Sequence, residues 1–264
     1  MGTAGAAYAT IAAQGFSFAI SIFYLRKHKL FFSAADQKKV AFQWNKLASI
    51  LKVGMPTAIQ MVVVNTAYLV VTGMLNQFGT SVSAASGIGL QINTFAGMPC
   101  WAIGQAVTAM IGQCIGAGQI QRARKVVRIG LLLNIFVTFV IVIIVQLFAE
   151  QMVLLFGSTN PEMVNNGVSY LRVCCSVNSL VYAAMYTLDS FVIGVGAANV
   201  AMFNAVLDAV IVRLPLSWFF AFALRMGFSG ICYGQALSPI LPALIGFFYF
   251  KSKAWERKTL IQKH

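Results

Sequence analysis

Three ionisable side chains lie well inside long apolar stretches of this sequence: Asp189, Asp208 and Arg213. In a membrane-spanning helix, a charged side chain near the bilayer centre costs about 2.5–3.5 kcal/mol on insertion scales, so such residues are candidates for function and face the interior of the bundle. Asn204 precedes Asp208 by four residues, which places both on one helix face. These residues predict a polar pocket for a cation. Two structural alternatives stay open: Arg213 neutralises one aspartate, or it extends to the membrane surface.

Two stripes of polar side chains accompany these charges. Tyr182 and Tyr186 precede Asp189 in one stripe, at spacings of four and three residues. The second stripe lies in another apolar stretch and consists of amides, a phenol and a hydroxyl: Gln60, Asn65, Tyr68, Thr72 and Asn76. These side chains predict the lining of a cavity that holds a cationic, aromatic molecule. Hydrogen bonding between helices is the alternative explanation.

Metal, redox and catalytic chemistry have no comparable support in the sequence. The five cysteines form no Cys-x-x-Cys pair, and the two histidines lie outside the apolar stretches. Histidines, cysteines and acids do not cluster inside those stretches as a membrane enzyme requires. We therefore expect no metal, no cofactor and no enzyme activity.

The elements that must position these residues are transmembrane helices. Hydrophobic residues make up 59% of the 264 residues and charged residues 9%, against about 25% charged in an ordinary soluble domain. About 20 apolar helical residues are needed to cross a bilayer core. The sequence predicts an all-α, polytopic bundle with spans at about 3–25, 50–78, 84–115, 128–149, 167–193, 197–222 and 227–250.

Basic residues give the chain a formal charge of +13, and 16 of the 19 lie in three segments, 26–52, 122–128 and 251–263. These segments alternate with apolar stretches as the positive-inside rule expects of cytoplasmic loops, so membrane lipid and not nucleic acid is the expected partner. The rule places the N-terminus outside the cell membrane and the C-terminus in the cytoplasm.

The first and last spans resemble one another. An ungapped alignment of residues 1–25 with 226–250 gives seven identities, including a shared Met-Gly-x-x-Gly-x-x-Tyr start. Transporters are commonly built from such repeats. The repeat and the interfacial aromatic residues predict four parts. Residues 1–25 are the last helix of a missing first lobe, 26–49 a cytoplasmic basic interfacial linker, 50–251 a six-helix second lobe and 252–264 a basic cytoplasmic tail.

Short motifs add a family resemblance. Their residues are Gly54, Pro56, Pro99, Gly104, Gln105, Thr108, Gly112, Gln113, Gly116, Gly118, Arg213 and Pro215. In these motifs the chain resembles the C-terminal lobe, with one preceding helix, of the multidrug and toxic-compound extrusion (MATE) family, whose superfamily also holds flippases. Read structurally, the GxxxG spacing of Gly112 and Gly116 predicts close helix packing, Gly116 and Gly118 end a span, and Pro99 permits a kink or hinge.

The resemblance implies a secondary antiporter of two six-helix lobes that exports small-molecule drugs or organic cations in exchange for H⁺ or Na⁺. This chain would then be a partial transporter whose partner is the missing N-terminal lobe. Sodium-type members carry acids where this sequence has Val64 and Tyr182, so the coupling ion stays open. A flippase for lipid-linked oligosaccharides is the alternative, although it needs a more cationic cavity and Arg213 is the only basic candidate. A seven-helix receptor fits the helix count and orientation but not the repeat.

Overall fold

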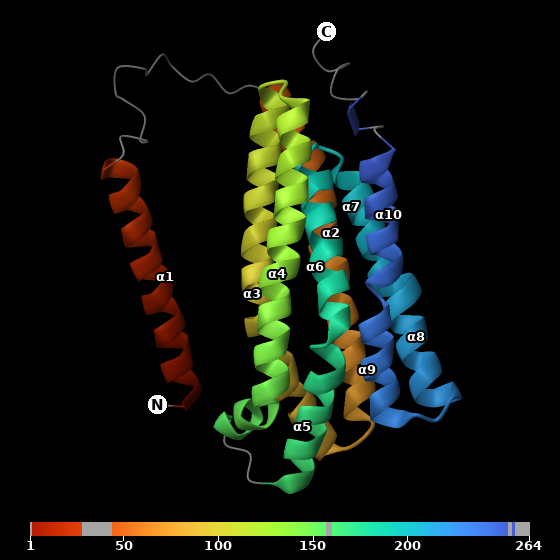
Figure 1. Ribbon diagram of the computed structural model, residues 1–264. Coiled ribbons are helices and arrows are strands. Elements are labelled where there is room, and N and C mark those ends of the chain that lie inside the picture. Colours follow the sequence, from red (N-terminus) through yellow and green to blue (C-terminus); the bar gives the residue numbers. More distant parts are fainter. Residues whose placement is uncertain (1, 28–43, 157–159, 253–254, 257–264) are drawn as a thin grey trace. The chain divides into compact units, whose positions relative to one another are not determined.

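The computed structural model describes residues 2–27, 44–156, 160–252 and 255–256, and all regular structure within them is helical (Figure 1). Six helices in these ranges are long and apolar enough to cross a membrane, and a bent helix pair makes a seventh span when it is counted as one. The expected all-α, polytopic bundle is therefore confirmed. The chain divides into two compact units, Met1–Leu47 and Ala48–His264, which are described separately.

The first unit contains helix α1 (Gly2–Lys27), which ends in Arg26 and Lys27. Its 26 residues extend about 39 Å at 1.5 Å per residue, enough to cross a bilayer core. None of its apolar span is buried within this unit, as expected of a helix whose surroundings are lipid or other helices. Most of the predicted interfacial linker, residues 28–43, lies outside the described residues.

Three long helices begin the bundle of the second unit: α2 (Trp44–Asn76), α3 (Thr80–Gly116) and α4 (Ile120–Leu155). The first four residues of α2 belong to the first unit. Only three residues separate α3 from α4, and Gly118 among them has a φ of 72°, a conformation that favours glycine. The prediction that this glycine segment ends a span is confirmed. The basic residues of 122–128 were expected in a loop, but they lie in the first turns of α4.

The remaining spans are interrupted helices. Helices α5 (Pro161–Cys174) and α6 (Val177–Gly194) together form one bent span, with an angle of 52° at the break. The next span runs without a loop through α7 (Ala198–Val206), η2 (Leu207–Arg213), α8 (Leu214–Trp218) and η3 (Phe219–Ala223), of which η2 and η3 are π-helical. The last span consists of α9 (Gly227–Leu237) and α10 (Ile240–Lys251).

The two copies of the internal repeat differ in one structural respect. Helix α1 is continuous, whereas its repeat partner is interrupted between α9 and α10 at Ser238 and Pro239. The aligned residues in α1 are Ala13 and Gln14. Proline lacks the backbone N–H that continues a helix and therefore accounts for a break in one copy alone.

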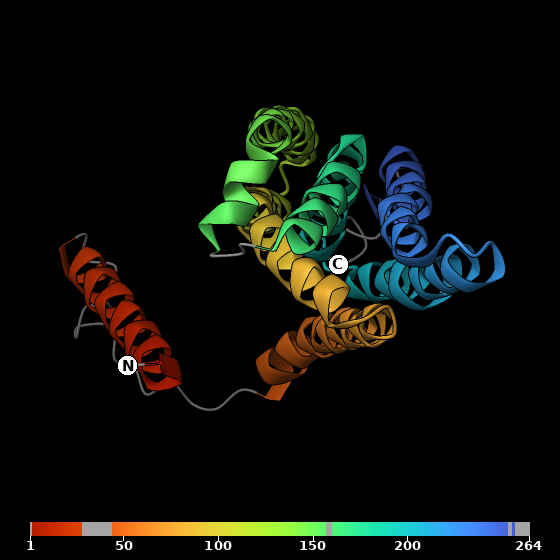
Figure 2. The same cartoon turned by 90° about the horizontal axis from the view of Figure 1, so that it is seen from below.

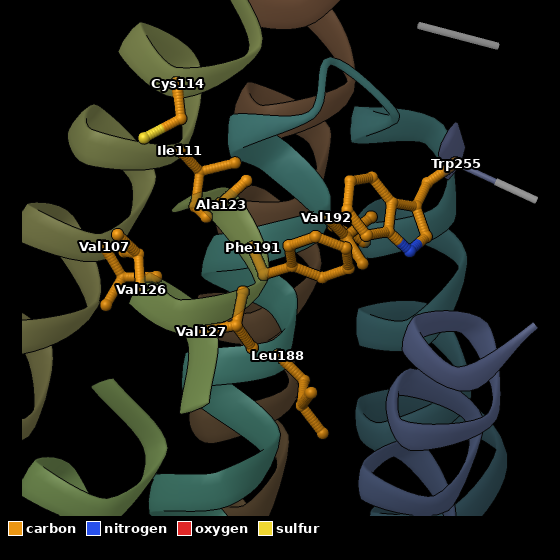
Figure 3. Packing of buried hydrophobic residues seen from close by; sticks show 11 residues of the cluster. Val107, Ile111, Cys114, Ala123, Val126, Val127, Leu188, Phe191, Val192 and Trp255 are labelled. Carbon is orange, nitrogen blue, oxygen red and sulfur yellow. The ribbon is translucent and has the colours of Figure 1, made fainter. Parts of the chain in front are cut away.

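Helix α3 packs against α4, α5 and α6, and α6 in turn packs against α10; Figure 2 views these helices end-on. The largest buried apolar cluster lies where α3, α4 and α6 meet the residues that follow α10 (Figure 3). Trp255 is fully buried there, and its ring packs edge-on against Phe191 with centroids 5.1 Å apart. Glu256 forms an ion pair with Arg124 of α4. These two residues of the expected tail are thus part of the folded unit.

Close helix packing occurs at a different glycine pair from the one expected. A Cβ atom on Gly116 would meet nothing within 4 Å, and one on Gly112 would meet only the carbonyl oxygen of Gly194 at 3.8 Å, so packing among the described residues does not require glycine at this pair. Gly230 and Gly234 have the same spacing. A Cβ atom on either would lie 2.5 Å from backbone atoms of the preceding span, so α9 approaches α8 and η3 closely there. Helix α3 continues through Pro99, and the hinge at that residue stays a prediction.

Candidate substrate and cation site

A cavity of about 380 Å³ lies inside the second unit, in the size range of small-molecule sites. Six stretches of the chain contribute to its wall: α2, α3, α4, the α5–α6 span, η2 and the α9–α10 segment. Four of the residues singled out from the sequence line it, namely Asn65, Tyr68, Tyr182 and Arg213. The prediction of a cavity lined by amides and phenols therefore has a counterpart in the structure, although only part of each stripe reaches it.

Further lining residues were not expected from the sequence. Trp101 of α3 lines the cavity, and its indole Nε1 donates a hydrogen bond of 3.3 Å to the hydroxyl of Tyr182. Asn93, Asn178 and Gln235 add amides to the wall. Trp101 lies one residue after Cys100 and two after Pro99, so its aromatic ring next to the motif proline was a signal that sequence reasoning passed over.

Asp189 and Asn204 are brought together, as the predicted polar pocket requires. Both are buried, and the Asn204 Nδ2 atom donates to Asp189 Oδ1 at 2.9 Å and to the backbone oxygen of Pro242 at 3.1 Å. Helices α6, α7 and α10 thus meet at this point. Across the described ranges, no Lys, Arg or His nitrogen lies within 4.0 Å of the Asp189 carboxylate. Asp189 is therefore a buried acid whose charge has no basic partner among these residues.

Asp208 has a different environment, because its Oδ2 atom lies 2.5 Å from Nη2 of Arg213. Side chains five residues apart are separated by about 140° around an ordinary α-helix. The π-helical turn changes this geometry: the N–H of Leu214 bonds to the carbonyl of Ala209, five residues earlier, and Asp208 and Arg213 come to the same side. The alternative in which Arg213 neutralises an aspartate is the observed geometry. The alternative in which it extends to the surface is wrong, since Arg213 is only 4% exposed.

Arg213 has two further neighbours, Ser238 and Tyr68. Its Nε atom donates to Ser238 Oγ at 3.2 Å, and its guanidinium carbon lies 5.0 Å from the centre of the Tyr68 ring. That ring contact is a cation–π interaction. The remaining Nη1 atom is buried and has no hydrogen-bond acceptor in the described structure.

The other predicted site residues lie outside the main cavity. Thr72 donates to the carbonyl of Tyr68 at 2.9 Å and lines a separate cavity of about 50 Å³. Asn76 accepts a hydrogen bond from Ser83 across the α2–α3 turn. Gln60 does not line either cavity. Tyr186 stacks with Tyr182, with ring centres 6.2 Å apart.

Two motif residues of α3 position α6 beside the cavity. A Cβ atom at Gly104 would overlap the ring of Tyr186, so only glycine permits this approach. Thr108 donates through Oγ1 to the carbonyl of Ser190 at 3.0 Å. Ser190 follows Asp189 directly, and these contacts therefore help to place the unpaired acid. Gln105 and Gln113 are exposed.

Asn134 is a buried polar residue that sequence reasoning missed. It is fully buried in α4, and its Nδ2 atom donates to Thr187 Oγ1 of α6 at 2.8 Å. The signal was present, because Asn134 and Thr138 are polar residues four positions apart in an otherwise apolar stretch. Interhelical hydrogen bonds therefore hold α4 and α6 together in addition to apolar packing.

These features define a polytopic membrane protein with an internal polar cavity and a separate buried acid. The family model MatE matches residues 56–219, more than half of the chain, and the chain belongs to the MATE family. It is 30% identical to the probable multidrug resistance protein YpnP of Bacillus subtilis, over 98% of this chain and 57% of that relative. It is 26% identical to the probable multidrug resistance protein NorM of Thermotoga maritima, over 100% of this chain and 56% of that relative.

Solved structures share this fold. The MATE transporter VcmN of Vibrio cholerae, in its bent form, superimposes with a TM-score of 0.80 and 21% identity, covering 97% of this chain and 57% of VcmN. The chain thus spans a little over half the length of these relatives.

Proposed function

We propose that this chain is one lobe of a secondary antiporter that exports small-molecule drugs, organic cations among them, in exchange for H⁺ or Na⁺. Family membership and the names of the relatives from Bacillus subtilis and Thermotoga maritima support export of drugs. The transporter would operate with a second lobe in a cell membrane, where the two lobes alternately open the substrate site to each side.

The observation that carries the proposal is the buried Asp189 carboxylate, which has no basic partner among the residues that the structure describes. A buried charge is costly unless a counter-charge or a proton neutralises it. Three oxygen-bearing groups meet here: the Asp189 carboxylate, the amide of Asn204, whose Oδ1 atom has no hydrogen-bond partner in the described structure, and the carbonyl of Pro242. Oxygen ligands of this kind suit a hard cation such as Na⁺, and the carboxylate alone suits a proton. Asp208 is the less suitable acid, because Arg213 already neutralises it.

Ion binding at Asp189 would drive export by favouring one conformation of the transporter. A bound ion shifts the balance of two conformations only if it binds them with different affinities. Asp189 lies on α6, which packs against α3, α4 and α10, so a change in its charge acts where several helices meet.

The cytoplasmic end of the second unit is proposed to be the end at which α10 finishes. The α3–α4 turn and the end of α10 lie at the same end of the bundle (Figure 1). Basic residues adjoin both places, in the first turns of α4 and at Lys251. The positive-inside rule supports a cytoplasmic location for that end and an external location for the N-terminus.

The experiment measures ethidium efflux driven by an imposed H⁺ or Na⁺ gradient, with this chain in its assembled transporter. We expect Asp189→Asn to abolish gradient-driven efflux at unchanged expression, since the amide cannot take up or release the ion. Glu150→Gln, which removes an exposed acid, is the matched control and should leave efflux unchanged. Full gradient-driven efflux by the Asp189→Asn protein would remove this carboxylate from the coupling mechanism.

A flippase remains the second candidate, favoured by one observation. Arg213 lines the cavity, and flippases for lipid-linked oligosaccharides need a cationic group there.

A further inference from the structure

Three of the five cysteines lie on the wall of the main cavity: Cys100, Cys174 and Cys175. All five are free thiols, and the proposed antiport mechanism uses none of them. Cys174 lines the cavity and is 7% exposed, so part of its surface is open to the cavity. A small molecule that has entered the lobe can therefore reach this side chain.

A second thiol adjoins Cys174. Cys232 of α9 is 1% exposed, and its side chain interacts with the Cys174 thiol within one buried cluster. Gly230 and Gly234 face η3 and α8, and residues two positions apart are separated by about 200° around a helix. Cys232, which lies between these glycines, therefore points away from η3 and α8 and toward α5, against which α9 also packs.

An aromatic pair one turn earlier shows the same register of the two helices. Tyr170 precedes Cys174 by four residues on α5, and Phe228 precedes Cys232 by four residues on α9. The two rings are stacked, with centroids 6.4 Å apart. Because residues four positions apart share a helix face, the packing that pairs the rings also pairs the thiols. The position of the thiol pair is thus set by helix packing.

Cys175 follows Cys174 in sequence but is a less suitable partner for it. Side chains of adjacent residues in a helical turn do not face each other. The Cys175 thiol is directed to another helix, because it donates to Asn93 Oδ1 of α3 at 3.0 Å. Cys174 and Cys232 are therefore the pair that a single ligand can bridge.

Two thiols without a third ligand restrict the chemistry of what can bind. Within the described ranges, no group of three His, Cys, Asp or Glu side chains could hold a metal ion. A trivalent aryl arsenical needs only two sulfur ligands, because its third bond is to its own aromatic carbon. Sulfur is a soft ligand and suits such a centre. Trp101 and Tyr182 of the same cavity offer aromatic surface to the aryl group.

From these contacts we propose that Cys174 and Cys232 form a dithiol site that binds trivalent aryl arsenicals from the cavity. With phenylarsine oxide, each thiol forms one As–S bond, the As=O bond breaks, and the oxygen leaves as water with the two thiol protons. Arsenic stays trivalent, so the reaction requires no oxidant or reductant. The product joins α5 to α9 covalently. The site requires only the folded second unit, so it goes beyond the proposed function and does not depend on antiport.

The test measures phenylarsine oxide binding to the purified 264-residue chain in phosphatidylcholine nanodiscs, with intact mass spectrometry as the readout. We expect a single bound arsenical that resists excess 2-mercaptoethanol and is released by 2,3-dimercaptopropanol, because only a dithiol replaces both As–S bonds at once. Peptide mass spectrometry of the wild-type adduct should find Cys174 and Cys232 joined by arsenic. An adduct that joins Cys174 to Cys175, or the absence of a stable adduct, would overturn the proposal.

Variants then assign binding to the two thiols. Cys174→Ser and Cys232→Ser should each weaken binding at least about 100-fold, because the second As–S bond no longer forms within one site. Unchanged binding by Cys232→Ser would contradict the proposal. If that variant does not fold, Cys232→Ala takes its place, and the wild-type adduct identifies the joined cysteines without any variant.

Two cysteines provide matched controls. Cys175→Ser keeps a hydroxyl that can donate to Asn93, and it should bind phenylarsine oxide as the wild type does. Cys114 is buried in α3 and lines neither of the two cavities, so Cys114→Ser should also bind normally. Loss of binding in Cys175→Ser with full binding in Cys232→Ser would place the arsenical on the adjacent pair and refute the site proposed between α5 and α9.

Discussion

At the scale of single residues, the two buried aspartates differ in the group that compensates the cost of burying their charge. Asp208 has a permanent counter-charge in Arg213, whereas Asp189 has an amide donor from Asn204. A permanent partner stabilises the charge and also excludes a cation from solution. An amide partner leaves room for an exchangeable proton or ion, which is why we propose the coupling role for Asp189.

The ion pair allows a stability prediction. Arg213→Gln should lower the free energy of unfolding by about 3–5 kcal/mol, because it leaves Asp208 buried and unpaired. Asp208→Asn/Arg213→Gln should recover most of this loss, since no charge remains. Unfolding in an SDS titration measures both values. If the stability loss of the double variant equals the sum of the losses in Arg213→Gln and Asp208→Asn, the two side chains act independently.

At the scale of elements, interruptions of helical regularity create the polar site. The π-helical turn η2 brings Asp208 and Arg213 together, and the break between α9 and α10 adjoins Ser238, which contacts the same arginine. At the break between α5 and α6, the backbone carbonyl of Cys175 accepts a hydrogen bond of 2.6 Å from the Nε2 atom of Gln146 in α4. Irregular backbone in a membrane is tolerated where it lines a cavity or is buried in protein, as it is here.

Helix contact at the glycines of α9 provides a second prediction. Gly234→Ala should destabilise the chain by about 1–3 kcal/mol, because the new Cβ atom would lie 2.5 Å from the backbone of Ser217, which cannot yield as a side chain can. Gly116→Ala is the matched control, since its Cβ atom would meet nothing within 4 Å. That control should remain within about 1 kcal/mol of the wild type. Thermal unfolding in detergent measures both, and equal stability of the two variants would contradict the packing argument.

At the scale of the whole second unit, the residues after α10 join its helices at one end. Trp255 packs against Phe191 of α6 and donates to the carbonyl of Phe250 at 3.2 Å, and Glu256 pairs with Arg124 of α4 (Figure 3 shows the cluster around Trp255). These contacts connect the end of the last span to α4 and α6. The segment thus has a structural role beyond its charge.

Removal of the Trp255 ring should have a large effect. Trp255→Ala should cost about 3–5 kcal/mol, as is usual for a buried aromatic side chain. Trp218→Ala, at a residue that is 55% exposed, is the matched control and should cost far less. Arg124→Gln should cost at most about 1 kcal/mol, because the ion pair is partly exposed. Thermal unfolding without denaturant measures the stability of the three variants. A Trp255→Ala protein as stable as the Trp218→Ala protein would disprove the structural role of Trp255.

The sequence was informative about the bundle and less so about its contacts. Apolar length predicted the spans, because the length of a span follows from bilayer thickness. Loop charge predicted their orientation through the positive-inside rule. The 3.6-residue period of an α-helix predicted that Asn204 lies near the aspartates. The same period places Asp208 and Arg213 on different sides of the helix, because the π-helical turn that brings them together is not predicted by residue spacing. GxxxG spacing recurs at Gly112 and Gly230, and only three-dimensional contact distinguishes the packed pair from the open one. Trp255 was hidden in a basic tail whose charge predicts exposure.

The burial of Trp255 also has a consequence for the order of synthesis. A ribosome releases the chain from its N-terminus, so α3, α4 and α6 are complete well before residue 255 emerges. Phe191 therefore meets Trp255 only after the last span has been made. Assembly of this end of the unit is therefore a late event, and premature termination shortly after Lys251 would produce a protein with every span of the unit but with an unfilled site beside Phe191.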